Sequence, residues 1–264
     1  MAESKGGKFE FGTIAGLMLG FGAIFGSFIL EGGKLGALIL LPAMIVVFGG
    51  TIATALTGTP IDIFLKLPKF FMLACFPPKV NVEETIQIVV DYSTTARKGG
   101  LLALESGLSD ITNPFLKKML GLAVDGTNPE VIRDIADIEM SYITERHNTN
   151  AGMFVKMGGY SPTMGIIGTV IGLIQTLANA GEDSITLIKH IAGAFIATLW
   201  GVFMANIVWL PIADRLKSIH AEEKVSLEVI LEGVLAIQAG ESPSLTRTKL
   251  YSILPASKQV TDGK

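Results

Sequence analysis

Side chains able to accompany a cation gather in one uncharged stretch, residues 158–180, which reads GGYSPTMGIIGTVIGLIQTLANA. Its small and polar residues recur at i, i+3, i+4, i+7, i+10 and i+11, which is one face of a helix. They are Gly165, Gly168, Thr169, Gly172, Gln175 and Thr176. Polar groups at membrane depth are costly and usually face a protein interior or a wet path. Either this face offers hydroxyls to an ion, or it only packs one helix against another.

A second stretch, residues 191–213, follows the same design. Small residues recur in it every four positions, forming a smooth ridge: Gly193, Ala197, Gly201 and Ala205. Thr198 lies beside the ridge, where its hydroxyl either lines an ion path or bonds to its own i−4 carbonyl. Each stretch also holds a proline, Pro162 and Pro211, which removes a backbone donor and favours a bend. Two such helices could enclose a third helix that a partner supplies.

Asp, Glu, Lys, Arg and His are absent from all four apolar stretches of the sequence, residues 11–30, 35–57, 157–180 and 191–213. A proton relay or ion carrier needs a titratable or anionic group at membrane depth. If the chain belongs to an ion-driven machine, a partner must therefore supply the acid. H⁺ or Na⁺ would then be the transported species rather than a bound cofactor.

Neither an enzyme nor a metal protein is indicated by the sequence motifs. A P-loop, a Rossmann glycine motif, a zinc motif and a nucleophile elbow are all missing. The single cysteine, Cys75, cannot form an intrachain disulfide. His147, His190 and His220 lie far apart in sequence and show no ligand spacing. We expect no catalysis, no cofactor and no metal.

The overall composition predicts an all-α, polytopic membrane protein with a sizeable aqueous part. Of 264 residues, 49% are hydrophobic and only 17% charged, and the mean hydropathy is +0.52. This balance is too apolar for an ordinary soluble domain. The formal net charge of −3 argues against binding to nucleic acid.

Four transmembrane helices and a helical cytoplasmic domain follow from this pattern. Residues 1–57 are expected to form a transmembrane hairpin with spans 11–30 and 35–57. Residues 58–156 form the cytoplasmic domain, beginning with an interfacial helix at 61–76. Residues 157–213 hold spans 157–180 and 191–213, and residues 214–264 form a cytoplasmic helix and tail.

Basic residues predict the orientation of these spans. The segment 58–156 holds ten lysines and arginines and the segment 214–264 holds seven, whereas each short connection holds one, Lys34 or Lys189. Basic residues favour the cytoplasmic side. We therefore expect a multi-pass protein of the cytoplasmic (inner) membrane with both termini in the cytoplasm.

Local signals predict where the helices of the aqueous part begin and end. Asn81 with Glu84 three residues on is a capping box, and Asn113 and Asn128 each precede a proline at the first helical position. A helix from Pro129 is expected to run into the third span with a break near Gly158-Gly159. The last helix should end at Gln238, and a loose tail should follow Gly240.

Three segments of the chain resemble the MotA/PomA-type flagellar stator subunit. They are GGYSPTMGIIGTVIGL, GAFIATLWGVFMANIVWLPIADRL and, between the second and third spans, RKGGLLALE. The resemblance covers nearly the whole chain. It implies a motility function in a homopentamer that surrounds two copies of a MotB/PomB-type partner, each with one span whose aspartate carries the ion.

The resemblance also assigns roles to single residues. Arg97 and Glu105 match a basic and an acidic residue that contact the rotor switch ring. Pro162, Pro211 and Thr198 match functional positions of the family, and a threonine at Thr169 is commoner in sodium-driven members. The alternative is a TolQ/ExbB-like energiser of another envelope process. That group has three spans, so the N-terminal hairpin favours the stator.

Overall fold

The computed structural model describes residues 11–179, 181 and 184–255. Every regular element in these residues is a helix, and no strand occurs among them. The all-α prediction is thereby confirmed.

The described residues fall into two compact units, each considered by itself. The apolar unit comprises residues 11–77 and 147–218, and the polar unit comprises residues 78–146 and 219–255. Two long helices, α8 (Pro129–Ala178) and α10 (Leu210–Gln238), contribute residues to both units.

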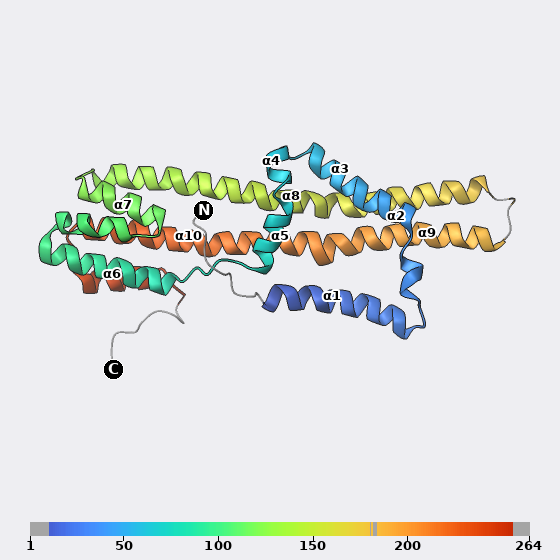
Figure 1. The fold of residues 1–264 in the computed structure, drawn as a ribbon, viewed down its shortest axis with the longest axis horizontal. Helices are drawn as coiled ribbons and strands as arrows, with labels where there is room; N and C mark the ends of the chain where they lie inside the picture. Colours follow the sequence, from blue (N-terminus) through green and yellow to red (C-terminus); the bar gives the residue numbers. More distant parts are fainter. Residues whose placement is uncertain (1–10, 180, 182–183, 256–264) are drawn as a thin grey trace. The chain divides into compact units, whose positions relative to one another are not determined.

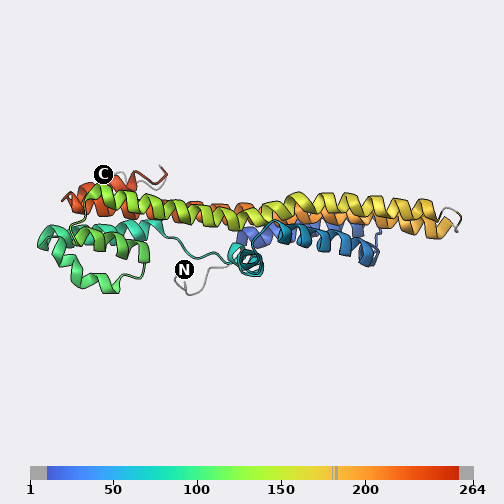
Figure 2. The same cartoon turned by 90° about the horizontal axis from the view of Figure 1, so that it is seen from above.

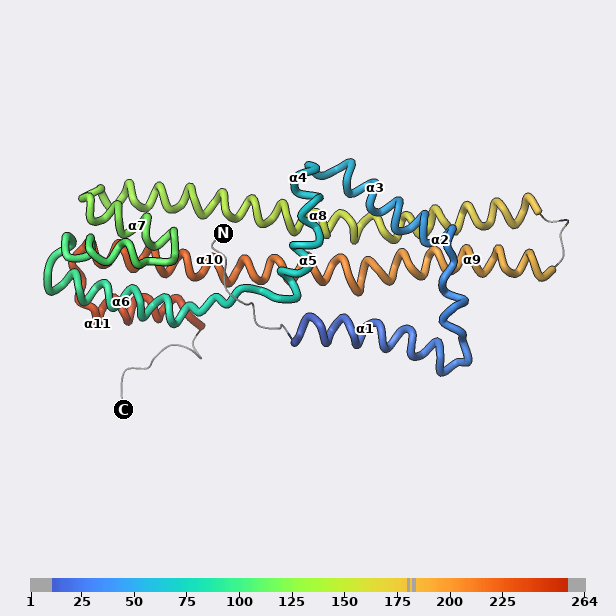
Figure 3. The backbone as a smooth tube through the Cα atoms, viewed as in Figure 1, coloured from blue at the N-terminus to red at the C-terminus, as the bar shows by residue number. Residues whose placement is uncertain are grey.

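The apolar unit contains, besides parts of α8 and α10, the nine shorter elements of its described residues. They are α1 (Phe11–Leu30), η1 (Leu35–Leu38), α2 (Leu41–Met44), η2 (Ile45–Gly49), α3 (Gly50–Thr57), α4 (Ile61–Phe64), α5 (Leu67–Cys75), α9 (Ser184–Phe203) and η4 (Met204–Trp209). The elements η2 and η4 are π-helical segments within otherwise α-helical runs. Figure 3 traces the chain from α1 through the extended connection around η1 into α2.

Three continuous helical runs are long and apolar enough to cross a membrane: α1, α8 and the run Ser184–Gln238. The fourth predicted span, residues 35–57, begins later than expected, because its helix runs only from Leu41 to Thr57. Pro42 lies in the first turn of that helix, where its missing N–H costs no hydrogen bond. Seventeen residues rise about 26 Å, so a fourth crossing stays a prediction.

Aromatic side chains hold α1 against α9 in the apolar unit. The rings of Phe21 and Phe203 meet edge to face with their centroids 4.7 Å apart, and Phe25 contacts both Phe203 and Trp200. The indole of Trp200 also donates a hydrogen bond of 2.8 Å to the carbonyl oxygen of Leu38. This bond fixes the connection after α1 to the last turn of α9.

The prediction of an interfacial helix at 61–76 is wrong in one respect, because these residues form two helices. α4 ends at Phe64 and α5 begins at Leu67. The ring of Pro68 would clash with the carbonyl group of residue 64 if one helix ran through. Phe70 in α5 is buried in a core that it shares with Phe154 of α8 and with α10.

The expected break at Gly158-Gly159 is also wrong, because α8 runs through both glycines and through Pro162. A Cβ on Gly158 would lie 2.5 Å from the side chain of Leu210. The glycine therefore serves close packing against α10, and that packing outweighs its poor helix propensity.

The polar unit forms one core between its short helices and the adjoining parts of α8 and α10. The short elements are α6 (Val82–Gly99), η3 (Leu101–Asp110), α7 (Pro114–Val124) and α11 (Pro243–Tyr251). The predicted caps are confirmed: Asn81 accepts from the Glu84 N–H, Asn113 from Phe115 and Leu116, and Asn128 from Glu130.

The segment after Gly240 was predicted as a loose tail, and this is wrong for residues 243–251. They form α11, which begins at an N-cap where Ser242 accepts a hydrogen bond from the Leu245 N–H. Thr246 and Leu250 on α11 are fully buried, and α11 packs beside α6 (Figure 3). Most residues of α11 are polar, so its few apolar positions give no clear helical pattern in the sequence.

Candidate functional site

The small-residue faces of α8 and α9 lie against each other in the apolar unit. Gly165 and Gly201 meet at the closest point, where a Cβ on Gly165 would lie 2.9 Å from the Ala197 carbonyl oxygen. Ser161, which is buried, donates a hydrogen bond of 2.9 Å to the Gly201 carbonyl. Two views show α8 and α9 side by side, in Figure 1 and, turned by 90°, in Figure 2.

The other small residues take places along the same contact or next to it. A Cβ on Gly168 would meet the side chain of Ala197 at 2.7 Å, and one on Gly172 would meet that of Ala194 at 3.0 Å. A Cβ on Gly193 would instead meet the side chain of Leu40 at 2.6 Å, just before α2. Ala205 is buried in η4. The small-residue ridge of residues 193–205 is therefore largely covered by other parts of the same chain. Less of its surface is available to a partner's helix than the sequence suggested.

Thr169 and Thr198 are brought together at the α8–α9 contact, and their hydroxyl groups are hydrogen-bonded to each other. The Thr169 hydroxyl also lies 2.9 Å from the carbonyl oxygen of Ala194 and 3.1 Å from that of Gly165. Two hydroxyls and two carbonyls thus form one cluster of oxygens, which we call the threonine cluster. Both threonines are half-buried.

The threonine cluster contains oxygen ligands without a carboxylate. The described parts of the apolar stretches hold no Asp, Glu, Lys, Arg or His. Hydroxyl and carbonyl oxygens can replace the water of an alkali cation, as the carbonyls of a channel filter do. They cannot carry a proton as an acid does. The roles of Thr169 and Thr198 in ion passage stay predictions.

The two prolines lie in different settings within the apolar unit. Pro162 is half-buried inside α8, directly after Ser161. Pro211 is exposed at the start of α10, just after the π-helical segment η4. Its missing N–H leaves the carbonyl of Ile207 without the usual i+4 donor. π-Helical segments occur frequently at functional sites. The sequence analysis did not predict the π-helical segment η4.

Pro211 also lines a cavity of about 270 Å³ between α1 and the start of α10. Gly12 and Gly16 form its α1 wall, and Arg215 lies at its α10 wall. Gly20 of α1 approaches η4 closely, since a Cβ there would lie 2.9 Å from the side chain of Ile207, whereas a Cβ on Gly16 would meet nothing within 4 Å.

Arg97 and Glu105 both lie exposed on the polar unit. Arg97 is in the last turn of α6 and Glu105 is in η3; the chain changes direction between them at Gly100, whose φ is +76°. The guanidinium of Arg97 donates a hydrogen bond of 2.8 Å to the carbonyl oxygen of Gly240. This partner lies 143 residues along the chain, so local spacing could not have indicated it.

Burial shifts one acid–base group close to this surface. The pKa of Tyr92 on α6 is raised, first by burial of the phenol and then by the nearby carboxylate of Asp110. The shift moves the Tyr92 phenol further from ionisation, so it adds no charge to α6 at physiological pH.

Two family models match the chain, one after the other. The Motility protein A N-terminal model matches residues 14–100. The model of the MotA/TolQ/ExbB proton channel family matches residues 108–229. Together they cover the spans and most of the polar unit.

Whole proteins with known names are similar along almost the full chain. Motility protein A of Bacillus subtilis (strain 168) is 35% identical over 249 residues, which cover 94% of this chain and 92% of that protein. The structure of C. jejuni MotAB has a TM-score of 0.90 at 30% identity and covers 96% of this chain and 100% of the other. The flagellar MotAB stator complex from Bacillus subtilis has a TM-score of 0.87 at 34% identity, covering 95% and 98%.

Proposed function

The chain belongs to the MotA/TolQ/ExbB proton channel family as a motility protein A-type subunit of the flagellar stator, and from this premise we propose that it forms an ion-driven torque unit with a MotB-type partner. The likeness to MotAB complexes along nearly the whole chain carries the assignment. It also favours the stator over a TolQ/ExbB-like energiser.

The partner supplies the acid in this proposal. The four apolar stretches contain no Asp, Glu, Lys, Arg or His, and an ion carrier at membrane depth needs such a group. A MotB-type helix with an aspartate would provide it. The resemblance further supports five copies of this chain around two copies of that helix. It also supports placement in the inner membrane with both termini in the cytoplasm.

Na⁺ is the cation that the threonine cluster favours over H⁺. Sodium needs several oxygen ligands to replace its water, whereas a proton needs only an acid and a hydrogen-bonded path. The Thr169 hydroxyl lies within hydrogen-bonding reach of both the Thr198 hydroxyl and the Ala194 carbonyl oxygen, so three oxygens gather around it. The partner's aspartate would add the negative charge.

The rotor is driven, in this proposal, through Arg97 and Glu105. Both side chains are exposed, and opposite charges on the rotor switch ring would attract them and fix the register. Pro162 and Pro211 would couple ion passage to this surface, because each interrupts the hydrogen-bond ladder of a helix at which bending is then easier.

Deletion of the gene for this chain tests the proposal. Cells should stop swimming while still building flagella, and production of this chain should restore swimming. In cells that also lack the MotB-type partner, swimming should return only when both proteins are produced together. Restored swimming with this chain alone in cells that lack both proteins would contradict the partner-borne acid. Normal swimming of the deletion strain, with no second stator present, would contradict the stator role itself.

A further inference from the structure

We infer that the turn between α10 and α11 is a positioning element for Arg97, which holds the guanidinium through the carbonyl group of Gly240. This inference rests on the proposed contact of Arg97 with the rotor. It names Gly240 and Lys249 as positioning residues that act through Arg97 and need not touch the rotor themselves.

One hydrogen bond links Arg97 to the turn. Its Nη1 atom donates to the Gly240 carbonyl oxygen at 2.8 Å. A guanidinium carries five N–H donors in a planar fork, so most of its donors remain available to a carboxylate on another protein. A free arginine side chain loses rotamer entropy when it is fixed. The bond to Gly240 restricts part of that freedom before the rotor arrives.

The direction of the Gly240 carbonyl is set by a Schellman motif at the end of α10. The Gly240 N–H donates to Ile237 and the Glu241 N–H donates to Ala236, each at 3.0 Å. Gly240 has φ +70°, in the left-handed region that other L-residues adopt only at a cost. A Cβ at this position would meet no atom within 4 Å. A substitution here therefore strains the backbone without causing a clash.

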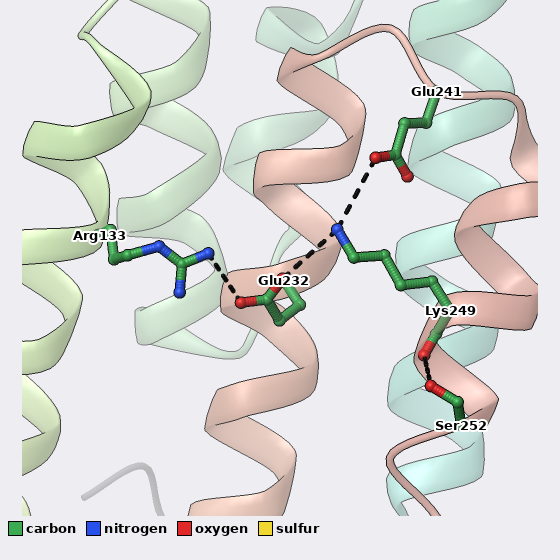
Figure 4. A network of polar contacts seen from close by, with 5 residues as sticks. All are labelled: Arg133, Glu232, Glu241, Lys249 and Ser252. Carbon is green, nitrogen blue, oxygen red and sulfur yellow. Dashed lines mark hydrogen bonds and ion pairs between the residues drawn. The ribbon is translucent and has the colours of Figure 1, made fainter.

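An ion-pair network holds α11 against this turn (Figure 4). The ammonium of Lys249 on α11 lies 3.4 Å from the carboxylate of Glu232 on α10 and 3.7 Å from that of Glu241 in the turn. Glu232 is also paired with Arg133 of α8 at 2.8 Å. Charges arranged as a network stabilise more than isolated surface pairs, so Lys249 links the turn to two helices of the polar unit.

Packing joins the same turn to α6, the helix that carries Arg97. Thr246 and Leu250 of α11 are buried. A Cβ on Gly233 of α10 would lie 2.2 Å from the side chain of Val89 on α6. The backbone of α10 therefore lies directly on α6, and a change in the α10–α11 turn reaches Arg97 over a short, packed distance.

Gly240→Ala tests the inference, with two variants as controls. Gly240→Asn keeps a residue that tolerates positive φ. Gly126→Ala imposes the same strain on the other Schellman glycine of the polar unit, at the end of α7, where φ is +75° and a Cβ also meets no atom within 4 Å. Stall torque is measured in motors driven by this chain and its partner. We expect Gly240→Ala to lower torque about twofold or more, because the strain at positive φ lowers the fraction of molecules in which the turn keeps its native conformation.

The Arg97→Ala background separates positioning from general damage. If Gly240 acts through Arg97, Gly240→Ala lowers torque no further in that background. Gly240→Asn and Gly126→Ala should retain torque. Equal losses with and without Arg97, or a loss in Gly126→Ala as large as in Gly240→Ala, would overturn the inference.

Lys249 provides a second, independent variant. Lys249→Gln should lower torque in the presence of Arg97 only, and Lys249→Arg should restore it. Lys118→Gln removes the 2.8 Å ion pair that joins Lys118 of α7 to Glu139 of α8 in the same unit, and should have no effect. The positioning role is refuted if Arg97→Ala lowers torque while Lys249→Gln and Gly240→Ala both leave it unchanged. That result would still be consistent with the rotor contact of Arg97. Normal torque in Arg97→Ala refutes the rotor contact.

Discussion

Gly165 of α8 and Gly201 of α9 bring two helix backbones into direct contact. A Cβ on Gly201 would lie 3.0 Å from the Cα of Gly165 and 2.6 Å from the Ser161 carbonyl oxygen. These neighbours are backbone atoms, which cannot turn away as a side chain can. The same approach brings Thr169 and Thr198 within hydrogen-bonding reach. Close packing and the clustering of oxygens are therefore one structural feature.

Gly165→Ala should destabilise the chain because both helices would have to move apart. Overpacking of this kind costs about 1–3 kcal/mol. Gly159→Ala is the matched control, since it lies in the same helix and a Cβ there meets nothing within 4 Å. Thermal unfolding of the purified complex in detergent measures both. A melting temperature for Gly165→Ala equal to that of Gly159→Ala would show that the contact tolerates a methyl group.

Thr169→Ala should weaken the dependence of swimming speed on external sodium at fixed pH, because it removes one oxygen of the threonine cluster. Thr198→Ala should act on the same step, so the double variant should lose less than the sum of the two single losses. Thr163→Ala is the control: its exposed hydroxyl in α8 bonds only to the Tyr160 carbonyl. Speed that ignores sodium in the unaltered chain but collapses with a proton uncoupler would identify H⁺ as the cation.

Charge reversal at Arg97 or Glu105 should reduce torque and leave assembly with the partner intact. Both side chains are exposed, so neither change buries a charge. A compensating reversal on the rotor should restore part of the torque, because the attraction depends on sign. Lys117→Glu makes the same charge change as the reversal of Arg97, at another exposed position of the polar unit, and cells with this variant should swim normally. Two normally swimming reversals would show that Arg97 and Glu105 are solvated surface only.

Liposomes that contain this chain alone should conduct neither H⁺ nor Na⁺ above the level of empty liposomes. The physical reason is that no acid lies in the four apolar stretches. Flux measured with a pH-sensitive and a sodium-sensitive dye tests both ions, and a channel-forming peptide serves as the positive control. A selective current through the chain by itself would remove the need for a partner's carboxylate.

The sequence alone determined the helical class and the ends of several helices. Uncharged runs of about twenty residues predict membrane helices because the bilayer excludes charge. Helix starts were predictable at Asn81, Asn113 and Asn128, because an N-cap is a local interaction within three residues. The sequence also showed that the apolar stretches lack an acidic side chain. That absence predicted a partner that supplies the acid.

Only the tertiary structure decided which residues meet. The pairing of Thr169 with Thr198, of Gly165 with Gly201 and of Arg97 with Gly240 joins positions 29 to 143 residues apart. Spacing along one helix cannot reveal such contacts, since it describes only the face of that helix. α11 was missed for the same reason: its few apolar residues give a weak pattern, and the helix is stabilised by packing on α6 and by the ion pairs of Lys249.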